Sequence, residues 1–310
     1  MTDRPAPQEA APRQTLGYLR NLFESRGIHP KNKLGQNFLI DLNLLDLVLR
    51  AAELTRDDVV VEVGSGTGGL TARLAEHAGN VLSVEIDRDF VELAEQAVAG
   101  RDNVTLVHTD ILKNKNHLSP VILQRLQELL RVSAAGKLKL VANLPYAVAT
   151  PVIANFLLSE FPFERMVVML QLEIAERLLA KPGCKEYGSL AVLVQSIADV
   201  EVVRHKLPPA VFWPRPQVAS SIIMIRPNAA KREHVGDVAR LRAFLRDLYT
   251  QRRKNLRGAL SGLPSGRIDK AEVDRKLAEL GLPGTVRAEE LDVEQHLRLC
   301  QAFAYQGSGI

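Results

Sequence analysis

The sequence predicts an α/β fold, with a Rossmann-like, doubly wound and mostly parallel sheet and a small helical C-terminal domain. Three observations support this prediction. Short apolar segments alternate with amphipathic segments between residues 59 and 141, which is typical of right-handed βαβ units. The first apolar segment runs into a glycine-rich turn, as in sheets that bind nucleotides. After Pro227 the remaining segments show only helical periodicity.

The N-terminal elements follow one another in a regular order. Residues 1–14 are rich in Pro, Ala and Gln, which predicts a disordered tail. Leu16, Leu19, Leu22 and Phe23 then form the apolar stripe of a short helix. The next predicted elements are strands at 59–63, 81–85, 104–108, 139–142 and 166–169, with helices through 70–75, near 90–98 and near 118–131 between them.

The C-terminal part is expected to be all helical. Its predicted helices occupy residues 235–250, 252–261, 269–280 and about 293–303. We therefore predict three parts: a tail over residues 1–14, an α/β domain over residues 15–227 and a helical domain over residues 228–310.

The composition limits the class of protein. With 310 residues, 46% hydrophobic and 25% charged, the chain resembles soluble globular proteins of one or two domains. Two distant cysteines, Cys184 and Cys300, and seven scattered histidines favour neither a disulfide framework nor a metal site. No apolar run is long enough to cross a membrane, and the first 27 residues show no secretory signal. We expect a cytoplasmic protein, and the net charge of +4 alone does not indicate nucleic-acid binding.

The glycine-rich turn is the first chemical signal. Gly64, Gly66 and Gly69 follow the pattern G-x-G-x-x-G between a predicted strand and a helix. Glu85 lies 21 residues after Gly64, at the end of the next strand. An acid there could bind both ribose hydroxyls of NAD or of S-adenosylmethionine. The turn itself leaves both cofactors open, together with a purely structural glycine turn.

Two downstream segments favour methyl transfer. Asp110 follows the third strand, where it could accept the amine of a cofactor adenine, and Asn143-Leu144-Pro145-Tyr146 follows the fourth. The carboxyl ends of parallel strands meet at one crevice. The Asn143 oxygen and a backbone carbonyl of Leu144 or Pro145 could hold both hydrogens of an adenine amine, which would localise its lone pair toward a methyl donor. Pro145 would fix the backbone.

Tyr146 could stack on an extruded base. In the competing interpretation Asn143 caps a turn, Pro145 starts a helix and Tyr146 belongs to the core.

Motifs between residues 33 and 291 resemble the KsgA-type ribosomal RNA adenine dimethyltransferases. The similar segments are 34–39, 62–68, 143–146, 170–173, 187–190, 208–218 and 251–254. The resemblance implies a class I methyltransferase domain, S-adenosylmethionine as cofactor and dimethylation of N6 in two adjacent adenosines. Those adenosines lie in the 3′-terminal hairpin loop of small-subunit (16S) rRNA, which implies a role in small-subunit biogenesis.

The resemblance also assigns roles to particular residues. It implies cofactor contacts by Asn37, Leu39, Gly64, Gly66, Glu85, Asp110 and Asn143, with catalysis by Asn143, Leu144, Pro145, Tyr146 and Phe212. In this assignment Phe212 is a second aromatic facing the base opposite Tyr146. The chain departs from the family's pattern at Ala147-Val148-Ala149, at Leu172, at Gln217-Val218-Ala219 and in the long stretch between Asp110 and Asn143. These departures bear on RNA contacts more than on the chemistry.

Basic charge is concentrated in one region. Residues 226–257 contain ten Lys or Arg and three acids, whereas residues 258–310 contain six Lys or Arg and eight acids. Local basic charge is typical of phosphate contacts, although a solvated helix face could carry it too. We therefore predict RNA binding by Arg252, Arg253, Lys254 and Arg257. The expected partners are small-subunit rRNA and the pre-30S particle, with no membrane, no metal and a monomeric chain.

Three other functions remain as alternatives. One is a family member with another target, either a large-subunit rRNA methyltransferase or an organelle type that doubles as a transcription factor. Another is a non-catalytic ribosome assembly factor, against which the intact Asn143–Tyr146 segment argues. An NAD dehydrogenase is least favoured, because no His or Lys stands in register to relay a proton.

Overall fold

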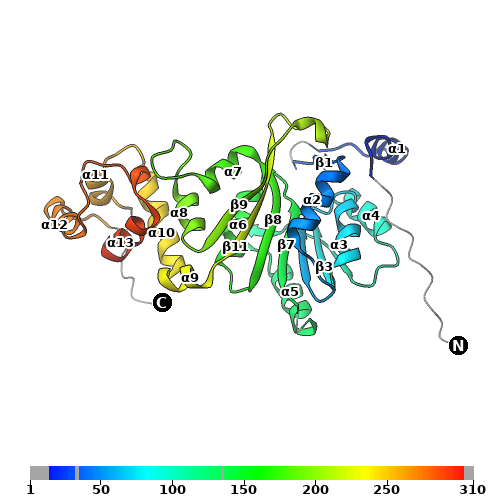
Figure 1. The fold of residues 1–310 in the computed structure, drawn as a ribbon, viewed down its shortest axis with the longest axis horizontal. Coiled ribbons are helices and arrows are strands. Elements are labelled where there is room, and N and C mark those ends of the chain that lie inside the picture. The colour runs from blue at the N-terminus through cyan, green and yellow to red at the C-terminus, as the bar shows by residue number, and fades with distance from the viewer. Residues whose placement is uncertain (1–13, 32–34, 134–135, 265, 304–310) are drawn as a thin grey trace. The chain divides into compact units, whose positions relative to one another are not determined.

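The computed structural model describes residues 14–31, 35–133, 136–264 and 266–303 (Figure 1). The chain forms two compact units: unit 1 comprises residues 1–172 and 201–226, and unit 2 comprises residues 173–200 and 227–310. The predicted domain division at residues 227/228 therefore differs from these units in residues 173–200. The tail expected over residues 1–14 lies outside the described residues, apart from Gln14, which is buried.

A seven-stranded sheet organises unit 1. Its order is β4-β3-β2-β7-β8-β11-β9. The strands are β2 (Val59–Val63), β3 (Asn80–Glu85), β4 (Val104–His108), β7 (Leu138–Asn143), β8 (Phe163–Gln171), β9 (Ala198–Leu207) and β11 (Ser220–Pro227). The strands from β4 to β8 in this order are parallel, and β11 runs antiparallel to β8. The predicted Rossmann-like, mostly parallel fold and its strands are confirmed.

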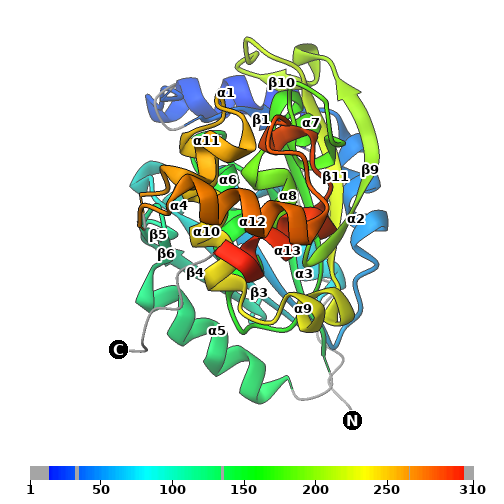
Figure 2. The ribbon, with the colours of Figure 1, turned by 90° about the vertical axis from the view of Figure 1, so that its left-hand side faces the viewer.

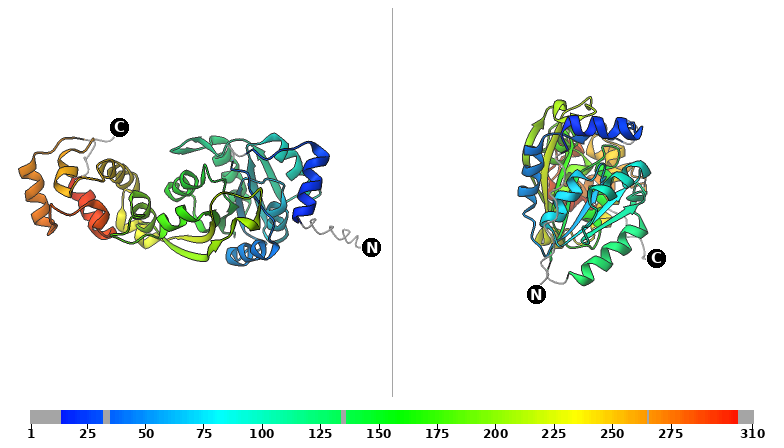
Figure 3. Two further views of the ribbon diagram at one scale, coloured as in Figure 1. Left: turned by 90° about the horizontal axis from the view of Figure 1, so that it is seen from above. Right: turned by 90° about the vertical axis from the view of Figure 1, so that its right-hand side faces the viewer.

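The helices of unit 1 precede or connect these strands, and the connecting helices complete the βαβ units. They are α1 (Leu16–Arg26), α2 (Leu42–Ala52), α3 (Gly69–His77), α4 (Arg88–Ala97), α5 (Pro120–Val132) and α6 (Ala149–Leu158). Side chains of α2 and α3 pack with alternate residues of β2, β3, β7, β8 and β11 in one apolar core. Helix α5 projects beyond the other elements of unit 1 (Figure 3).

Two pairs of short strands lie outside the large sheet. Strand β1 (Phe38–Leu39) pairs antiparallel with β10 (Phe212–Trp213), and β5 (Leu112–Asn114) pairs with β6 (His117–Leu118). The turn η2 (Pro209–Val211) precedes β10. The sequence did not indicate these pairs, because two or three residues are too few to show a period.

Unit 2 is helical over most of its length (Figure 2). Its elements are α7 (Leu172–Leu179), whose first residue belongs to unit 1, α8 (Ser189–Gln195), α9 (Ala229–Val235), α10 (Val238–Thr250), α11 (Leu256–Ser261), α12 (Lys270–Leu280), η3 (Ala288–Glu290) and α13 (Val293–Phe303). Among the described residues, no helix is long and apolar enough to cross a membrane, and no group of three His, Cys, Asp or Glu could hold a metal ion.

Two of the predicted C-terminal helices have different bounds. The helix expected at 235–250 begins only at Val238, because Gly236, with φ of 69°, ends the unpredicted helix α9 and Asp237 caps α10 by accepting from the Arg240 N–H. The helix expected at 252–261 starts only at Leu256, because the Asn255 side chain caps it. Asp and Asn favour caps since their side chains satisfy the unpaired N–H groups of the first turn.

Candidate active site

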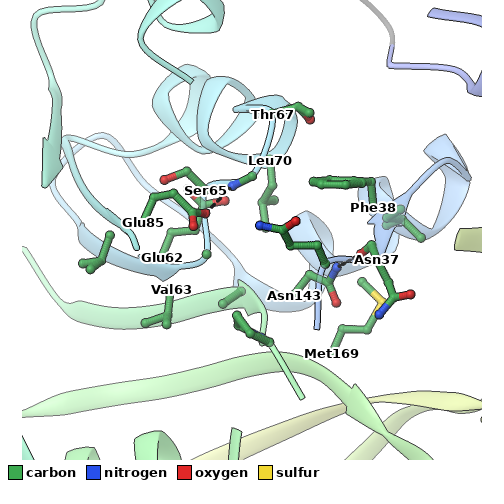
Figure 4. A pocket seen from close by; sticks show the side chains of 18 of the residues that line it. Asn37, Phe38, Glu62, Val63, Ser65, Thr67, Leu70, Glu85, Asn143 and Met169 are labelled. Carbon is green, nitrogen blue, oxygen red and sulfur yellow. Dashed lines mark hydrogen bonds between the residues drawn. The ribbon is translucent and has the colours of Figure 1, made fainter. Parts of the chain in front are cut away.

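A cavity opens at the carboxyl ends of β2, β3, β4 and β7 (Figure 4). Every residue that the sequence assigned to cofactor binding lines it: Asn37, Leu39, Gly64, Gly66, Glu85, Asp110 and Asn143. Pro145 lines it as well. These residues come from five chain segments that meet at one edge of the sheet, as parallel strand topology requires.

The glycine loop brings backbone close to two neighbouring elements. Gly64 and Gly66 have φ of 85° and 52°, in the region that favours glycine. A Cβ on Gly66 would lie 2.9 Å from the Phe38 ring, and one on Gly64 would lie 3.1 Å from Cγ of Pro145. The loop thus touches the Asn143–Tyr146 segment directly. Gly68, with φ of 76°, is the N-cap of α3, so Gly69 is the first residue of that helix.

Glu85 presents a constrained carboxylate to the cavity. It is 7% exposed. Its Oε2 accepts from the Gly66 N–H at 2.9 Å, and its Oε1 accepts from the N–H groups of Ile86 and Asp87 at 2.9 and 3.0 Å. Burial raises the pKa of Glu85 above its ordinary value, and these three hydrogen bonds oppose that rise. The carboxylate is therefore fixed in place beside the glycine loop.

Glu62, which sequence reasoning did not single out, is a second carboxyl in the cavity wall. It is 1% exposed, and its Oε2 accepts from the hydroxyls of Thr71 and Ser83, both at 2.6 Å. Burial raises the pKa of Glu62 to about 8, and the nearby Glu85 charge adds to the rise, against the two hydroxyl bonds. An acid inside an apolar strand next to a glycine loop was the signal that could have found it.

The Asn143 amide is oriented by the chain itself. Its Nδ2 donates to the backbone carbonyl of Asn37 at 2.9 Å, and the two residues lie next to each other in the cavity (Figure 4). The Oδ1 atom receives no hydrogen bond from a described residue. Since an amide oxygen is an acceptor, the side chain offers an acceptor at a fixed position.

The backbone groups of Leu144 and Pro145, which follow Asn143, differ in their hydrogen-bond partners. Leu144 is buried, and its N–H donates to the Met169 carbonyl at 3.0 Å. The Pro145 carbonyl accepts from the N–H groups of Val148 and Ala149, at 3.0 and 3.1 Å, and so starts α6. The Pro145 carbonyl is therefore occupied, whereas no described backbone N–H donates to the Leu144 carbonyl.

The two predicted stacking aromatics are not among the residues that line the cavity. The Tyr146 hydroxyl lies 2.7 Å from the Ser220 hydroxyl, at the start of β11. Phe212 is 1% exposed and packs in the core with side chains of α2 and the sheet. Its pairing with Leu39 across β1 and β10 turns its ring inward. The structure brings Asn143 and Pro145 to the cavity lining, but not Leu144, Tyr146 or Phe212.

The N-terminal segment adds a wall to the cavity that the sequence did not indicate. Gln14 lines the cavity, and its amide donates to the Thr67 carbonyl at 2.9 Å and accepts from the Thr67 hydroxyl. In α1, Phe23 packs edge-to-face on Phe38 with ring centroids 5.4 Å apart. Composition predicted that Gln14 belongs to a disordered tail, whereas its hydrogen bonds to Thr67 place it in the cavity wall.

The predicted RNA-binding cluster is partly neutralised within unit 2. Arg252 bonds Glu289 at 2.5 Å and the Lys185 carbonyl at 2.6 Å. Arg257 makes two bonds to Asp274, at 2.6 and 2.7 Å. Arg253 and Lys254 are exposed, and neither forms an ion pair with a described residue.

Comparisons with known proteins agree with this geometry. Residues 28–304 match the family "Ribosomal RNA adenine dimethylase". The chain is 37% identical over 290 residues to "Ribosomal RNA small subunit methyltransferase A" of Lachnoclostridium phytofermentans, covering 93% of this chain and 95% of the relative. The protein of that name from Geobacillus kaustophilus is 38% identical over 295 residues, covering 94% and 96%.

Two solved structures share the fold. A dimethyladenosine transferase from Plasmodium falciparum superposes with a TM-score of 0.69 at 24% identity, over 84% of this chain and 95% of that one. The 23S rRNA methyltransferase ErmE superposes with a TM-score of 0.59 at 24% identity, over 86% and 100%.

Proposed function

The chain belongs to the ribosomal RNA adenine dimethylase family, and from this premise we propose that it dimethylates N6 of two adjacent adenosines in small-subunit rRNA. The substrate is the 3′-terminal hairpin loop of 16S rRNA within the pre-30S particle, and the methyl donor is S-adenosylmethionine. The relatives named small subunit methyltransferase A, which match more than nine-tenths of the chain, support this target. The oriented Asn143 amide beside the glycine loop is the observation that carries the proposal.

The residues of the cavity fit S-adenosylmethionine. Glu85 is a carboxylate acceptor for ribose hydroxyls, and Asp110 uses Oδ1 for the Leu112 N–H, which leaves Oδ2 for an adenine amine. The buried Glu85 carboxylate beside the glycine loop suits a cationic sulfonium better than an anionic pyrophosphate. The one cation in the wall, among the described residues, is Arg73, which already pairs with Asp46 at 2.8 Å. When bound, this cofactor would supply an electrophilic methyl group.

The chain's own groups prepare the adenine amine. The lone pair of the adenine N6 is delocalised into the ring, so the planar amine is a poor nucleophile. The Asn143 Oδ1 would accept one amine hydrogen and the Leu144 carbonyl the other, because the Pro145 carbonyl is already bonded to α6. Holding both hydrogens favours a pyramidal nitrogen whose lone pair points at the methyl donor.

The same cavity disfavours hydride transfer with NAD. No His or Lys is present among the described residues that line it, so a proton relay for hydride transfer is missing there. This agrees with the family assignment and leaves methyl transfer as the chemistry that the site supports.

RNA recognition is divided between the two units in this proposal. Tyr146 and Phe212 would contact the extruded base from unit 1. The helical part over residues 228–310 would bind RNA through Arg253 and Lys254. Arg252 and Arg257 would contribute once RNA phosphates replace the carboxylates with which they now pair. We place the chain in the cytoplasm, as a monomer acting on pre-30S particles.

Mapping of the modified nucleotides tests the proposal. Purified chain, S-adenosylmethionine and 30S particles that lack the modification would be incubated, and the rRNA analysed by mass spectrometry. We expect two adjacent dimethyladenosines near the 3′ end of 16S rRNA, formed at least about 10²-fold more slowly with Asn143→Ala. Methylation of 23S rRNA instead would favour the large-subunit alternative, and no methylation of either RNA would favour an assembly factor.

A further inference from the structure

A segment of unit 1 carries cations that no carboxylate neutralises. Arg204 and Lys206 lie on β9, and Arg215 lies between β10 and β11; all three are exposed. The sequence has no Asp or Glu from residue 202 to residue 232. The nearest acid in the chain, Glu201, pairs with Arg226 at 2.6 Å. No described residue forms an ion pair with the three cations. We name residues 204–215 the basic hairpin segment.

This segment is attached to the candidate active site at two points. The Tyr146 hydroxyl contacts Ser220 at 2.7 Å, and the hydroxyl of the adjacent Ser221 donates to the Arg204 carbonyl at 2.9 Å. Arg204 therefore lies one strand away from the Ser220 that holds Tyr146. Between the cations, Phe212 pairs with Leu39 of the cavity wall. Arg204 is thus linked to Tyr146 through Ser221 and Ser220, and Arg215 follows Phe212 by three residues.

The strand pattern exposes Arg204 and Lys206 on one face. Val203 and Leu207 pack against the apolar core, and side chains alternate along a strand, so Arg204 and Lys206 project from the opposite face. Strand β9 is the last in the sheet order, so no further strand of unit 1 covers its free side. Both side chains are exposed, so the two cations have access to a ligand.

We propose that the basic hairpin segment binds the phosphate backbone of the RNA strand that carries the target adenosines, an inference that rests on the proposed function. Cations attract RNA by releasing its condensed counterions. Arg252 and Arg257 of unit 2 would first have to give up Glu289 and Asp274, whereas Arg204, Lys206 and Arg215 have no carboxylate to give up. The hairpin segment would fix the strand beside Tyr146, so its loss raises KM for RNA more than it lowers kcat.

The test compares two triple variants of the full chain. The hairpin variant is Arg204→Gln, Lys206→Gln, Arg215→Gln. The control, Arg125→Gln, Arg131→Gln, Lys137→Gln, removes the same charge from exposed cations on α5 and at the amino end of β7. Binding to a 16S rRNA 3′-hairpin is measured against salt concentration, S-adenosylmethionine binding by calorimetry, and kcat and KM on 30S particles.

For the hairpin variant we expect a smaller slope of log binding constant against log salt concentration. Each lost phosphate contact lowers the magnitude of this slope by about 0.7–0.9, so three lost contacts lower it by about 2–3. KM should rise at least tenfold, with kcat and cofactor affinity within threefold of wild type, and the control should keep the wild-type slope. An unchanged slope, or equal losses in both variants, would overturn the inference. If the hairpin variant does not fold, the single variant Arg215→Gln should lower the slope by about 0.7–0.9, and an unchanged slope there overturns the inference equally.

Failure of the proposed function would look different. Wild-type chain would then leave 16S rRNA unmethylated on 30S particles, whatever the salt slopes of the two variants.

Discussion

The cofactor side and the base side of the site differ in how completely the chain assembles them. On the cofactor side, three backbone N–H groups fix Glu85 and the Asn37 carbonyl fixes Asn143. On the base side, Tyr146 is bonded to Ser220 and Phe212 is packed in the core. The difference indicates that the proposed cofactor site is preorganised, whereas the proposed stacking on the target base would require both aromatic side chains to move.

The largest effect is expected on the cofactor side. Glu85→Ala removes the acceptor for the ribose hydroxyls and the anchor of the Gly66 N–H. Each charge-assisted hydrogen bond contributes about 1.5–3 kcal/mol, so S-adenosylmethionine affinity should fall by about 10²–10⁴-fold in calorimetry. Asp110→Ala, which removes a single amine contact, serves as the milder control. Unaltered affinity in Glu85→Ala would place the cofactor elsewhere.

The next effect separates chemistry from binding. Asn143→Ala removes the acceptor that the Asn37 carbonyl orients, so the rate of methyl transfer should fall by about 10²-fold or more. Cofactor affinity should change much less. Single-turnover rates with radiolabelled cofactor would measure this, and a rate within a few-fold of wild type would refute the role of Asn143.

A smaller effect is expected on the base side. Base stacking on an aromatic side chain contributes about 1–3 kcal/mol, so Tyr146→Ala should lower kcat/KM for RNA by about 5–150-fold and leave cofactor affinity unchanged. Ser220→Ala is the matched variant, since it frees Tyr146 without removing the ring. It should keep or raise kcat/KM, and a loss as large as that of Tyr146→Ala would show that the hydrogen bond to Ser220 is needed during turnover.

The smallest effect on catalysis is expected for Glu62, the buried carboxyl next to the glycine loop. The folded pKa of Glu62, about 8, lies above its ordinary value of 4.5. Its neutral form therefore contributes stability below pH 4.5 that is lost as the pH rises to about 8. Thermal unfolding should show that Glu62 lowers the free energy of unfolding by about 5 kcal/mol over this range, from about 1.4 kcal/mol per pKa unit. Glu62→Gln should remove that fall, and an identical pH profile in the variant would contradict the burial of an ionisable Glu62.

The sequence predicted the parts of the fold that local pattern determines. Strands β2, β3, β4 and β7 and the glycine loop follow from βαβ periodicity and from glycine spacing. The cofactor residues converge because parallel strands place their carboxyl ends together, which topology determines without knowledge of side-chain contacts.

The remaining features depend on contacts between distant residues. Gln14 reaches Thr67 across 53 positions, and Arg252 finds Glu289 across 37. The inward position of Phe212 comes from its pairing with Leu39, which no local period reveals. Strand β11, which runs antiparallel to β8, and strand β9 were also outside the prediction, which located a strand only at 166–169 in that half of the sheet.

A crystal structure of the chain with a non-reactive S-adenosylmethionine analogue and the 16S 3′-hairpin would test the difference between the two sides most directly. We expect Nδ2 of Asn143 to remain within about 0.5 Å of its present 2.9 Å separation from the Asn37 carbonyl, as preorganised sites do. The Tyr146 hydroxyl should have left Ser220, with its ring stacked on an extruded adenine. A complex that retains the Tyr146–Ser220 bond while Asn143 turns away from Asn37 would contradict the account.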